Sequence, residues 1–301
     1  MARFGKKKRT VAAVLAGLLL IWVAVTWATL PAVGKLATEN PKTTALIEAR
    51  AREAEAAGRK PLRRQRWVPL SAVAPAAVQA VIASEDARFW QHEGVDTVEL
   101  EIALEEALER KELGRGASTI TQQLAKNLWL SGDRSLLRKL KELVLARRLE
   151  KELEKSRILA LYLNVVEWGH GIYGIDAAAR AHFGVAAAAL TPAQGAILAG
   201  MLPAPLRWTP GAKPPVLRRR ALRIVGSLEV AGRLSAAQAA AARVEIEARL
   251  GRGKPAPAPT PAAPVVAEPA TAESPPEPEA AAAAEAEAPA EAEAPPEAPA
   301  P

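Results

Sequence analysis

The sequence predicts a mainly α-helical protein with an N-terminal transmembrane helix and a disordered C-terminal tail. Apolar residues recur at helical spacing through most of the stretch 67–250. An uncharged apolar run occupies 11–30, and the last 47 residues are almost only Pro, Ala and Glu. The chain has no internal repeat and no convincing series of alternating strands, so we expect neither a repeat array nor a β-sandwich.

The N-terminal segment, residues 1–34, is predicted to be a basic cytoplasmic end followed by a membrane anchor. No charged residue occurs between Arg9 and Lys35, and a basic cluster precedes the apolar run from Val11 to Leu30. A helix of that length crosses a hydrocarbon core of ~30 Å. The basic cluster favours a cytoplasmic N-terminus and an exported remainder. A cleaved signal peptide is the alternative.

Between the two ends the pattern predicts a series of helices. A proline at the first position starts the helix 75–84, and Gly114 closes the helix 98–113. The next helix begins at Ser118 or Thr119. The remaining predicted helices lie at 135–164 (two helices broken near Ser156), 175–182, 192–201 and 216–250 (two helices broken at Gly232).

The predicted domain organisation places the folded domain at 67–210. A charged, poorly patterned juxtamembrane linker precedes it at 35–66, and a C-terminal helical extension follows at 211–254. The tail, 255–301, lacks the large apolar residues that a core requires, so it is predicted to be disordered.

Charge and cysteine content narrow the function classes. The tail carries nine Glu and no Lys or Arg, so by subtraction from the formal net charge of +7 the rest of the chain carries +16. A body this basic suits an anionic membrane surface or an anionic lipid-linked substrate. Nucleic acid is the usual rival, and export argues against it. The chain has no cysteine, so neither disulfides nor thiol chemistry contribute.

The segment ASTITQQLAKN, 117–127, is the most informative string. Thr119 followed by Gln122 predicts a capping box at a helix start. Thr119, Gln123 and Lys126 then share one helix face, with Asn127 beside them. A helix N-terminus with hydroxyls, an amide and a lysine suits an anion such as a phosphate. A capped surface helix is the alternative.

Two further strings supply carboxylates. Glu85 and Asp86 end an apolar helix, where the dipole and partial burial raise a carboxyl pKa toward the range of a general base or acid. Arg138, Lys139 and Glu142 can share one helix face. The alternatives are solvated charges in the first case and surface ion pairs in the second. Together with the phosphate-type helix, both strings suit transfer of a sugar from a pyrophosphate leaving group.

The order of the motifs resembles glycosyltransferase family 51, the peptidoglycan glycosyltransferases that polymerise lipid II. NVVEWGHGIYG in particular resembles its monofunctional biosynthetic transglycosylases. Glycines mark tight turns in that string, so we give it a mainly structural role, with Glu167 and His170 as catalytic residues the alternative. The chain has three histidines and no ligand spacing such as HExxH, so we expect no zinc site. The matching strings cover most of 67–208 and are EDARFWQHEG at Glu85, GASTITQQLAKN at Gly116, RKLKE at Arg138, KSRILALYLN at Lys155 and GIYGIDAAARAHFG at Gly171.

The resemblance implies a lysozyme-like, mainly α glycosyltransferase domain on the periplasmic side of the bacterial inner membrane. Glu85 matches the general base that deprotonates the 4-hydroxyl of the acceptor lipid II. Glu142 matches a second carboxylate, which assists at the side of the leaving group. The leaving group is undecaprenyl pyrophosphate, and the configuration at the anomeric carbon inverts. The positions that match the donor and pyrophosphate sites are Ser118, Thr119, Gln123, Lys126, Asn127, Arg138 and Lys139.

The resemblance also implies the cofactors and partners. A divalent cation on the substrate phosphates helps some family members, and this sequence encodes no separate metal site. The implied partners are lipid II, the lipid-linked glycan and the membrane, with cell-division or elongation proteins as further candidates. Two other classes remain open: a lytic transglycosylase or muramidase, and a non-catalytic scaffold. The departures from the family pattern are Ala117 for a glycine, Ala160 for a glutamate, and an acidic stretch at 99–112.

Overall fold

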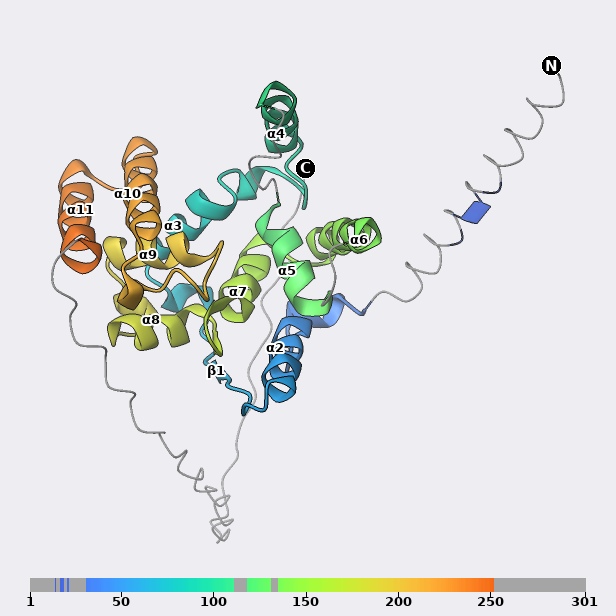
Figure 1. Cartoon of the computed structure of the whole chain (residues 1–301). Helices are drawn as coiled ribbons and strands as arrows, with labels where there is room; N and C mark the ends of the chain where they lie inside the picture. The colour runs from blue at the N-terminus through green and yellow to red at the C-terminus, as the bar shows by residue number, and fades with distance from the viewer. Residues whose placement is uncertain are drawn as a thin grey trace, which may run out of the picture. The chain divides into compact units, whose positions relative to one another are not determined.

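The computed structural model describes residues 31–110, 118–130 and 135–251, together with residues 14, 17, 18 and 21. These residues belong to one compact unit and are mainly helical, as predicted (Figure 1). The α-helices are α2 (Ala45–Ala56), α3 (Pro75–Glu85), α4 (Thr97–Arg110), α5 (Ile120–Trp129), α6 (Leu136–Glu152), α7 (Lys155–Val165), α8 (Ile175–Phe183), α9 (Pro192–Met201), α10 (Pro215–Val230) and α11 (Ala236–Leu250).

Helix α9 is the centre of one group of packed helices. Thr191 caps its N-terminus in a capping box with Gln194, and residues 193–201 are all buried. It contacts α3, α10 and α11, which Figure 1 shows side by side. Small residues allow this close packing: a Cβ added at Gly195 would lie 2.6 Å from the Cα of Ala77 in α3. The first turn of α3 is therefore held close to α9, and near its other end Ser84 Oγ, next to Glu85, lies 3.4 Å from the carbonyl oxygen of Ala199 in α9.

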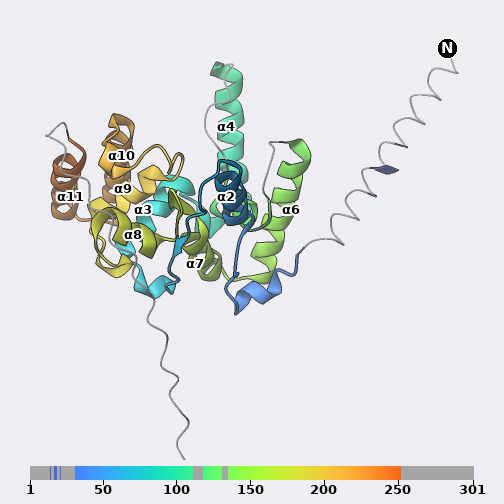
Figure 2. The ribbon, with the colours of Figure 1, turned by 60° about the horizontal axis from the view of Figure 1, so that its bottom comes forward.

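A second group of helices surrounds α5. This helix contacts α2, α6 and α7, and residues 158–165 of α7 are buried. Ser135 caps α6 by accepting a hydrogen bond from the backbone N–H of Arg138. The break between α6 and α7 falls at Leu153 and Glu154, slightly before the predicted position at Ser156. Helix α4 projects away from both groups in Figures 1 and 2.

A small three-stranded sheet, which the sequence did not predict, lies among the helices. Its strands are β1 (Arg64–Gln65), β2 (Glu167–Gly169) and β3 (Ile172–Tyr173), in the order β1-β3-β2. Strand β3 is parallel to β1 and antiparallel to β2. Strands of two or three residues are too short for an alternating pattern to show in the sequence.

The expectation of a poorly patterned linker at 35–66 is wrong. This segment contains α2 and β1, and Thr44 caps α2 by accepting a hydrogen bond from Ile47. Ile47 is the buried residue of α2, so the helix lacks the apolar stripe that a sequence pattern would reveal. An ion pair fixes it instead: Arg50 donates to the buried carboxylate of Glu167 in β2 at 2.9 and 3.0 Å.

The C-terminal extension is helical, as predicted, and Gly232 lies in the break with φ +66°. It is nevertheless part of the same core, because Leu217, Ala221 and Val225 of α10 are buried in it. The separation of 211–254 from the folded domain therefore does not hold.

Three predicted features lie outside the described residues. They are most of the N-terminal basic end and transmembrane segment, the end of the predicted helix 98–113 with the following Gly114 and Ala117, and the tail 255–301. Within the part of the chain that the structure describes, no helix combines the length and the apolar character that crossing a bilayer requires.

Candidate active site

Glu85 is the last residue of α3, and both of its carboxylate oxygens are held. Ser84 Oγ donates to Oε1 at 3.1 Å, and Gln123 Nε2 of α5 donates to Oε2 at 3.0 Å. Burial raises the pKa of Glu85, while these two hydrogen bonds and the positive charges of Arg220 and Lys126 oppose the rise. Part of the side chain stays exposed. Glu85 is thus a positioned carboxylate with a raised pKa, as predicted from its place at a buried helix end.

Tyr162 of α7 stands behind Gln123. Its hydroxyl donates to Gln123 Oε1 at 3.0 Å, which orients the amide so that its nitrogen faces Glu85. Burial, together with the negative charges of Glu85 and Asp86, raises the pKa of Tyr162 well above its ordinary value of 10. The phenol therefore stays protonated and remains a donor. Sequence reasoning missed Tyr162 because it lies among the apolar residues of α7.

Asp86 has a structural role next to Glu85. Its Oδ2 accepts from the backbone N–H of Ile120, the first residue of α5, at 2.9 Å, and its Oδ1 lies 2.9 Å from His92 Nε2. Thr119 caps α5 by accepting from Gln122 N and donates to Gly94 O at 2.7 Å. The N-terminus of α5 is thus occupied by the protein's own carboxylate. An anionic substrate would have to be held mainly by side-chain cations.

The predicted capping box is formed only in part. Thr119 accepts the expected backbone bond, but the side chain of Gln122 turns to another partner, since its Oε1 accepts from Lys139 Nζ at 3.2 Å. The same ammonium donates to Ser118 Oγ at 3.0 Å and to Glu142 Oε1 at 2.5 Å. Lys139 therefore ties α6 to the start of α5.

Glu142 is buried, with a side chain only 4% exposed, and lies between two cations of its own helix. Besides the bond from Lys139, its Oε2 accepts from Arg138 Nη1 at 3.3 Å. The surface-pair alternative for this trio does not hold, because exposed ion pairs do not bury a carboxylate to this extent. Glu142 holds the two cations in a fixed arrangement on the same side of α5.

Lys126 links the two carboxylates electrostatically. Desolvation lowers the pKa of its ammonium, and Arg138 and Lys139 lower it further, whereas Glu142 and Glu85 raise it. The charges of Glu85 and Glu142 thus both act on this lysine, although the two residues belong to separate helices. The residue keeps part of its surface exposed, so its ammonium can receive an anion.

Residues 53–229 match the sequence model of a protein family described as transglycosylase. The chain belongs to this transglycosylase family. It is also similar to curated proteins named biosynthetic peptidoglycan transglycosylase. The one from Nitrosospira multiformis is 40% identical over 189 residues, which are 63% of this chain and 82% of that relative. The one from Rhodospirillum centenum is 41% identical over 236 residues, which are 77% and 95%. The one from Bordetella pertussis is 52% identical over 143 residues, which are 46% and 59%.

The predicted site residues of the transglycosylase fall into three groups in the structure. Gln123 contacts Glu85, and Ser118, Arg138 and Lys139 gather around Glu142. Lys126 is coupled to both groups. Thr119 and Asn127 are buried, at 3% and 6% exposure, and Thr119 is engaged by the protein itself. We therefore assign Thr119 a structural contribution to the site.

Arg220 is the residue that sequence reasoning missed most completely. It belongs to α10, inside the stretch matched by the transglycosylase model but outside every motif that we singled out. Its Nη2 donates to Ser84 Oγ at 3.3 Å, so it reaches the residue next to Glu85 across 136 positions of sequence. No sequence pattern indicates the contact between Arg220 and Ser84, which only the tertiary structure shows.

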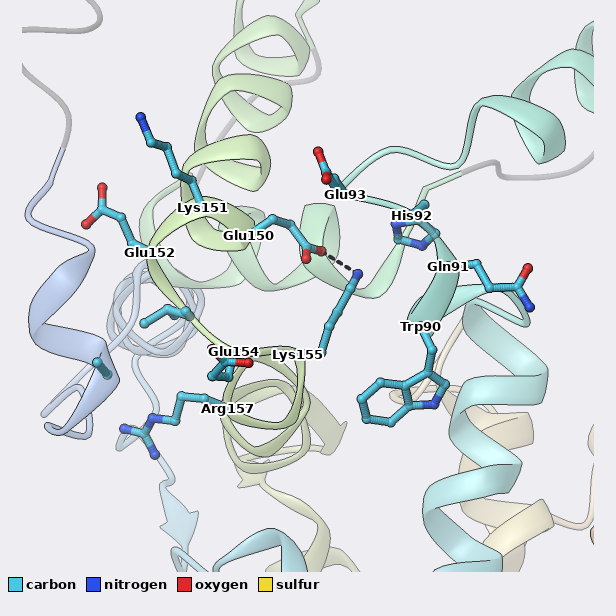
Figure 3. A pocket seen from close by; sticks show the side chains of 12 residues that line it. Trp90, Gln91, His92, Glu93, Glu150, Lys151, Glu152, Glu154, Lys155 and Arg157 are labelled. Carbon is cyan, nitrogen blue, oxygen red and sulfur yellow. Dashed lines mark hydrogen bonds and ion pairs between the residues drawn. The ribbon is translucent and has the colours of Figure 1, made fainter. Parts of the chain in front are cut away.

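A hollow of about 520 Å³ lies beside the loop that follows Glu85, but neither Glu85 nor Glu142 lines it (Figure 3). Figure 3 shows Trp90 and His92 on one side and Glu152 and Arg157 on the other, with Lys155 between them bonded to Glu150. That bond measures 2.8 Å, and Lys155 also lies 4.4 Å from the centre of the Phe89 ring. These contacts brace the loop that follows Glu85.

Asp86, His92 and Asp96 are the described residues that could together ligate a cation, with donor atoms within 4.8 Å of one another. The two aspartates already accept hydrogen bonds through their carboxylate oxygens, whereas His92 Nδ1 is buried without a partner among the described residues. Asp96 accepts two backbone N–H bonds at the start of α4 and lies 3.5 Å from Arg88 Nε. A cation in this position would have to displace these bonds.

Proposed function

We propose that this transglycosylase polymerises lipid II into glycan strands for cell-wall synthesis, with Glu85 as general base. The carrying observation is the coupling of two dissimilar carboxylates through one lysine. Glu85 has a raised pKa and is a partly exposed residue, whereas Glu142 is buried among cations. Two carboxylates held in such different surroundings are typical of a site where each has a different role in one reaction. The names of the curated relatives point to the same activity.

In the proposed reaction, Glu85 takes the proton from the 4-hydroxyl of the acceptor lipid II. That oxygen forms a bond to the anomeric carbon of the lipid-linked glycan as the bond to pyrophosphate breaks, so the configuration inverts. A carboxylate whose pKa is raised by burial accepts this proton more readily than an exposed one. The bonds from Ser84 and Gln123 keep the carboxylate in one orientation during the attack.

The leaving pyrophosphate is proposed to bind among Lys126, Arg138 and Lys139. These three cations outnumber the one carboxylate that they share, Glu142, so the cluster keeps a net positive charge for the phosphates. Fixed cations stabilise the negative charge that develops on a leaving phosphate. A divalent cation on the substrate pyrophosphate would assist in the same way, and we include it in the proposal as a helper.

The two other classes are less well supported. A muramidase needs an acid and has no use for a cluster of cations gathered around a buried carboxylate. A non-catalytic scaffold would not need a glutamate whose two carboxylate oxygens are both hydrogen-bonded, because that arrangement creates no surface for binding a partner protein. Four further proposals rest on the sequence. They are the anchor at 11–30, the inner-membrane location, the lysozyme-like character of the domain, and the recruitment of division or elongation proteins through the tail.

The test is polymerisation of lipid II by the full chain in detergent, with wild type beside Glu85→Gln. We expect strands from the wild type and a loss of at least about 100-fold in the variant. Glu93→Gln is the matched control, since it makes the same change in the same loop at a side chain that is 87% exposed. It should polymerise like wild type.

The other outcomes discriminate among the alternatives. If wild type makes no strands, the scaffold is favoured. If Glu85→Gln keeps full activity, Glu85 is not the base. Incubation with preformed glycan strands tests the muramidase, which would release short fragments from them.

A further inference from the structure

We propose that Arg220 and Ser84 form a positioning relay that orients the carboxylate of Glu85 from the side opposite Gln123. This role deepens the proposed function and rests on it, since it concerns the same general base. The relay would make α10, which lies beyond the recognised motifs, part of the active-site machinery. Neither residue is required to touch the substrate.

The relay joins two helices, α10 and α3. Arg220 Nη2 of α10 donates to Ser84 Oγ at 3.3 Å, and Ser84 Oγ donates to Glu85 Oε1 at 3.1 Å. Because the guanidinium has only donors, it occupies a lone pair of the serine oxygen. The single hydroxyl hydrogen must then point elsewhere, and Glu85 Oε1 is a nearer acceptor than the carbonyl oxygen of Ala199 at 3.4 Å.

Arg220 itself is held in place by α9 and the loop that follows it. Its Nε donates to the carbonyl oxygen of Gly200 at 3.2 Å, and its guanidinium carbon lies 5.8 Å from the centre of the Trp208 ring. The bond from Nε and the ring contact fix the plane of the guanidinium, so the Nη2 donor has a defined direction. The relay therefore starts from a rigid support.

The carboxylate of Glu85 is consequently braced from two directions. Tyr162 acts through Gln123 on Oε2, and Arg220 acts through Ser84 on Oε1. Each arm consists of a buried or supported donor and an intermediate side chain that accepts from it and donates to Glu85. With both oxygens bonded, rotation of the carboxylate is restricted, and the remaining lone pairs keep one direction for the incoming hydroxyl.

The charged and titratable groups around Glu85 set the expected pH effect. Arg220 from α10 and Lys126 from α5 favour its ionised form, whereas Glu85 and the neighbouring Asp86 act on the phenol of Tyr162 from α7. Burial raises the pKa of Glu85, and both Arg220 and the hydroxyl of Ser84 oppose this rise. Removing either group weakens that opposition. The carboxylate should then bind its proton at higher pH.

The test compares Arg220→Met and Ser84→Ala with wild type in two assays. The first is the pH profile of kcat/KM for lipid II polymerisation, whose acidic limb should move to higher pH by roughly half to one unit in each variant. At a given pH on the acidic limb, each variant should have a lower kcat than wild type, with the KM for lipid II nearly unchanged. The double variant should shift at least as far as the larger single shift, because the charge of Arg220 also acts on Glu85 through space.

The second assay is independent of activity. It follows the side-chain carboxyl carbon of Glu85 by ¹³C NMR, with the resonance assigned by its absence from Glu85→Gln, and the same upward shift of the midpoint is expected. Arg223→Met is the matched control: it removes an exposed arginine from the same helix and should change neither the profile nor the midpoint. Thermal unfolding of each variant separates a loss of folding from a loss of positioning.

A uniform fall in rate at every pH, with an unshifted carboxyl midpoint in folded Ser84→Ala, would overturn the relay and leave Arg220 a packing residue. A wild type that makes no strands while the NMR midpoint still shifts would refute the proposed function and keep the contact between the relay and Glu85.

Discussion

Gly195→Ala probes the close contact between α9 and the first turn of α3, the helix that ends at Glu85. The added Cβ would lie 2.6 Å from Ala77 Cα and 2.9 Å from Ala77 Cβ, both closer than side-chain atoms approach in proteins. The nearest atom belongs to the backbone of α3, so the clash cannot be relieved by turning a side chain. The two helices must separate, and Glu85 must move with α3.

The size of the effect follows from two opposing contributions. Overpacking of a tight contact costs about 1–3 kcal/mol, whereas replacing Gly by Ala inside a helix gains about 0.5–1 kcal/mol. The clash should win at Gly195. For a domain of this size, each kcal/mol changes Tm by about 2–4 °C, so the Tm should fall by several degrees. A displaced base should also slow polymerisation by roughly ten- to a hundredfold.

Gly226→Ala supplies the matched control within the same core. Gly226 lies inside α10, and a Cβ added there would meet no atom within 4 Å. The same substitution should therefore raise Tm, by roughly 1–4 °C, and leave the polymerisation rate unchanged. Differential scanning calorimetry of both variants decides the question. A rise in Tm for Gly195→Ala would refute the close contact between α3 and α9.

Three further predictions concern charged side chains. Burial raises the pKa of Glu85 above the 4.5 of the unfolded chain, so wild-type stability falls as pH rises through the folded pKa. Glu85→Gln lacks that loss, and its Tm should gain on wild type between pH 4.5 and neutrality; a constant difference would contradict this. Lys139→Met removes the shortest bond to buried Glu142 and should cost about 1–3 kcal/mol in urea unfolding, most of which Glu142→Gln should restore in the double variant. Arg50→Met strips Glu167 of its two bonds, with a similar cost at neutral pH that shrinks in acid as Glu167 becomes protonated.

The helices and the site motifs were largely predictable because their signals are local. Thr119 and Ser135 cap α5 and α6 through residues three positions away, so a short string contains both partners. The carboxylate at the end of α3 was likewise visible as an acid after an apolar run. The linker expectation failed for the complementary reason. Helix α2 has a local cap at Thr44 but buries only Ile47, and Arg50 ties it to Glu167, a partner 117 residues away.

The sequence by itself determined which residue types are present and in what order, and this was enough for the helices, the family resemblance and the two candidate glutamates. Only the tertiary structure decided which groups act on them. It placed Asp86 at the start of α5, turned Gln122 toward Lys139, and brought Arg220 to Ser84. Hydrogen bonds require their atoms within about 3 Å of each other. Between residues far apart in the chain, only the packing of whole helices fixes such distances.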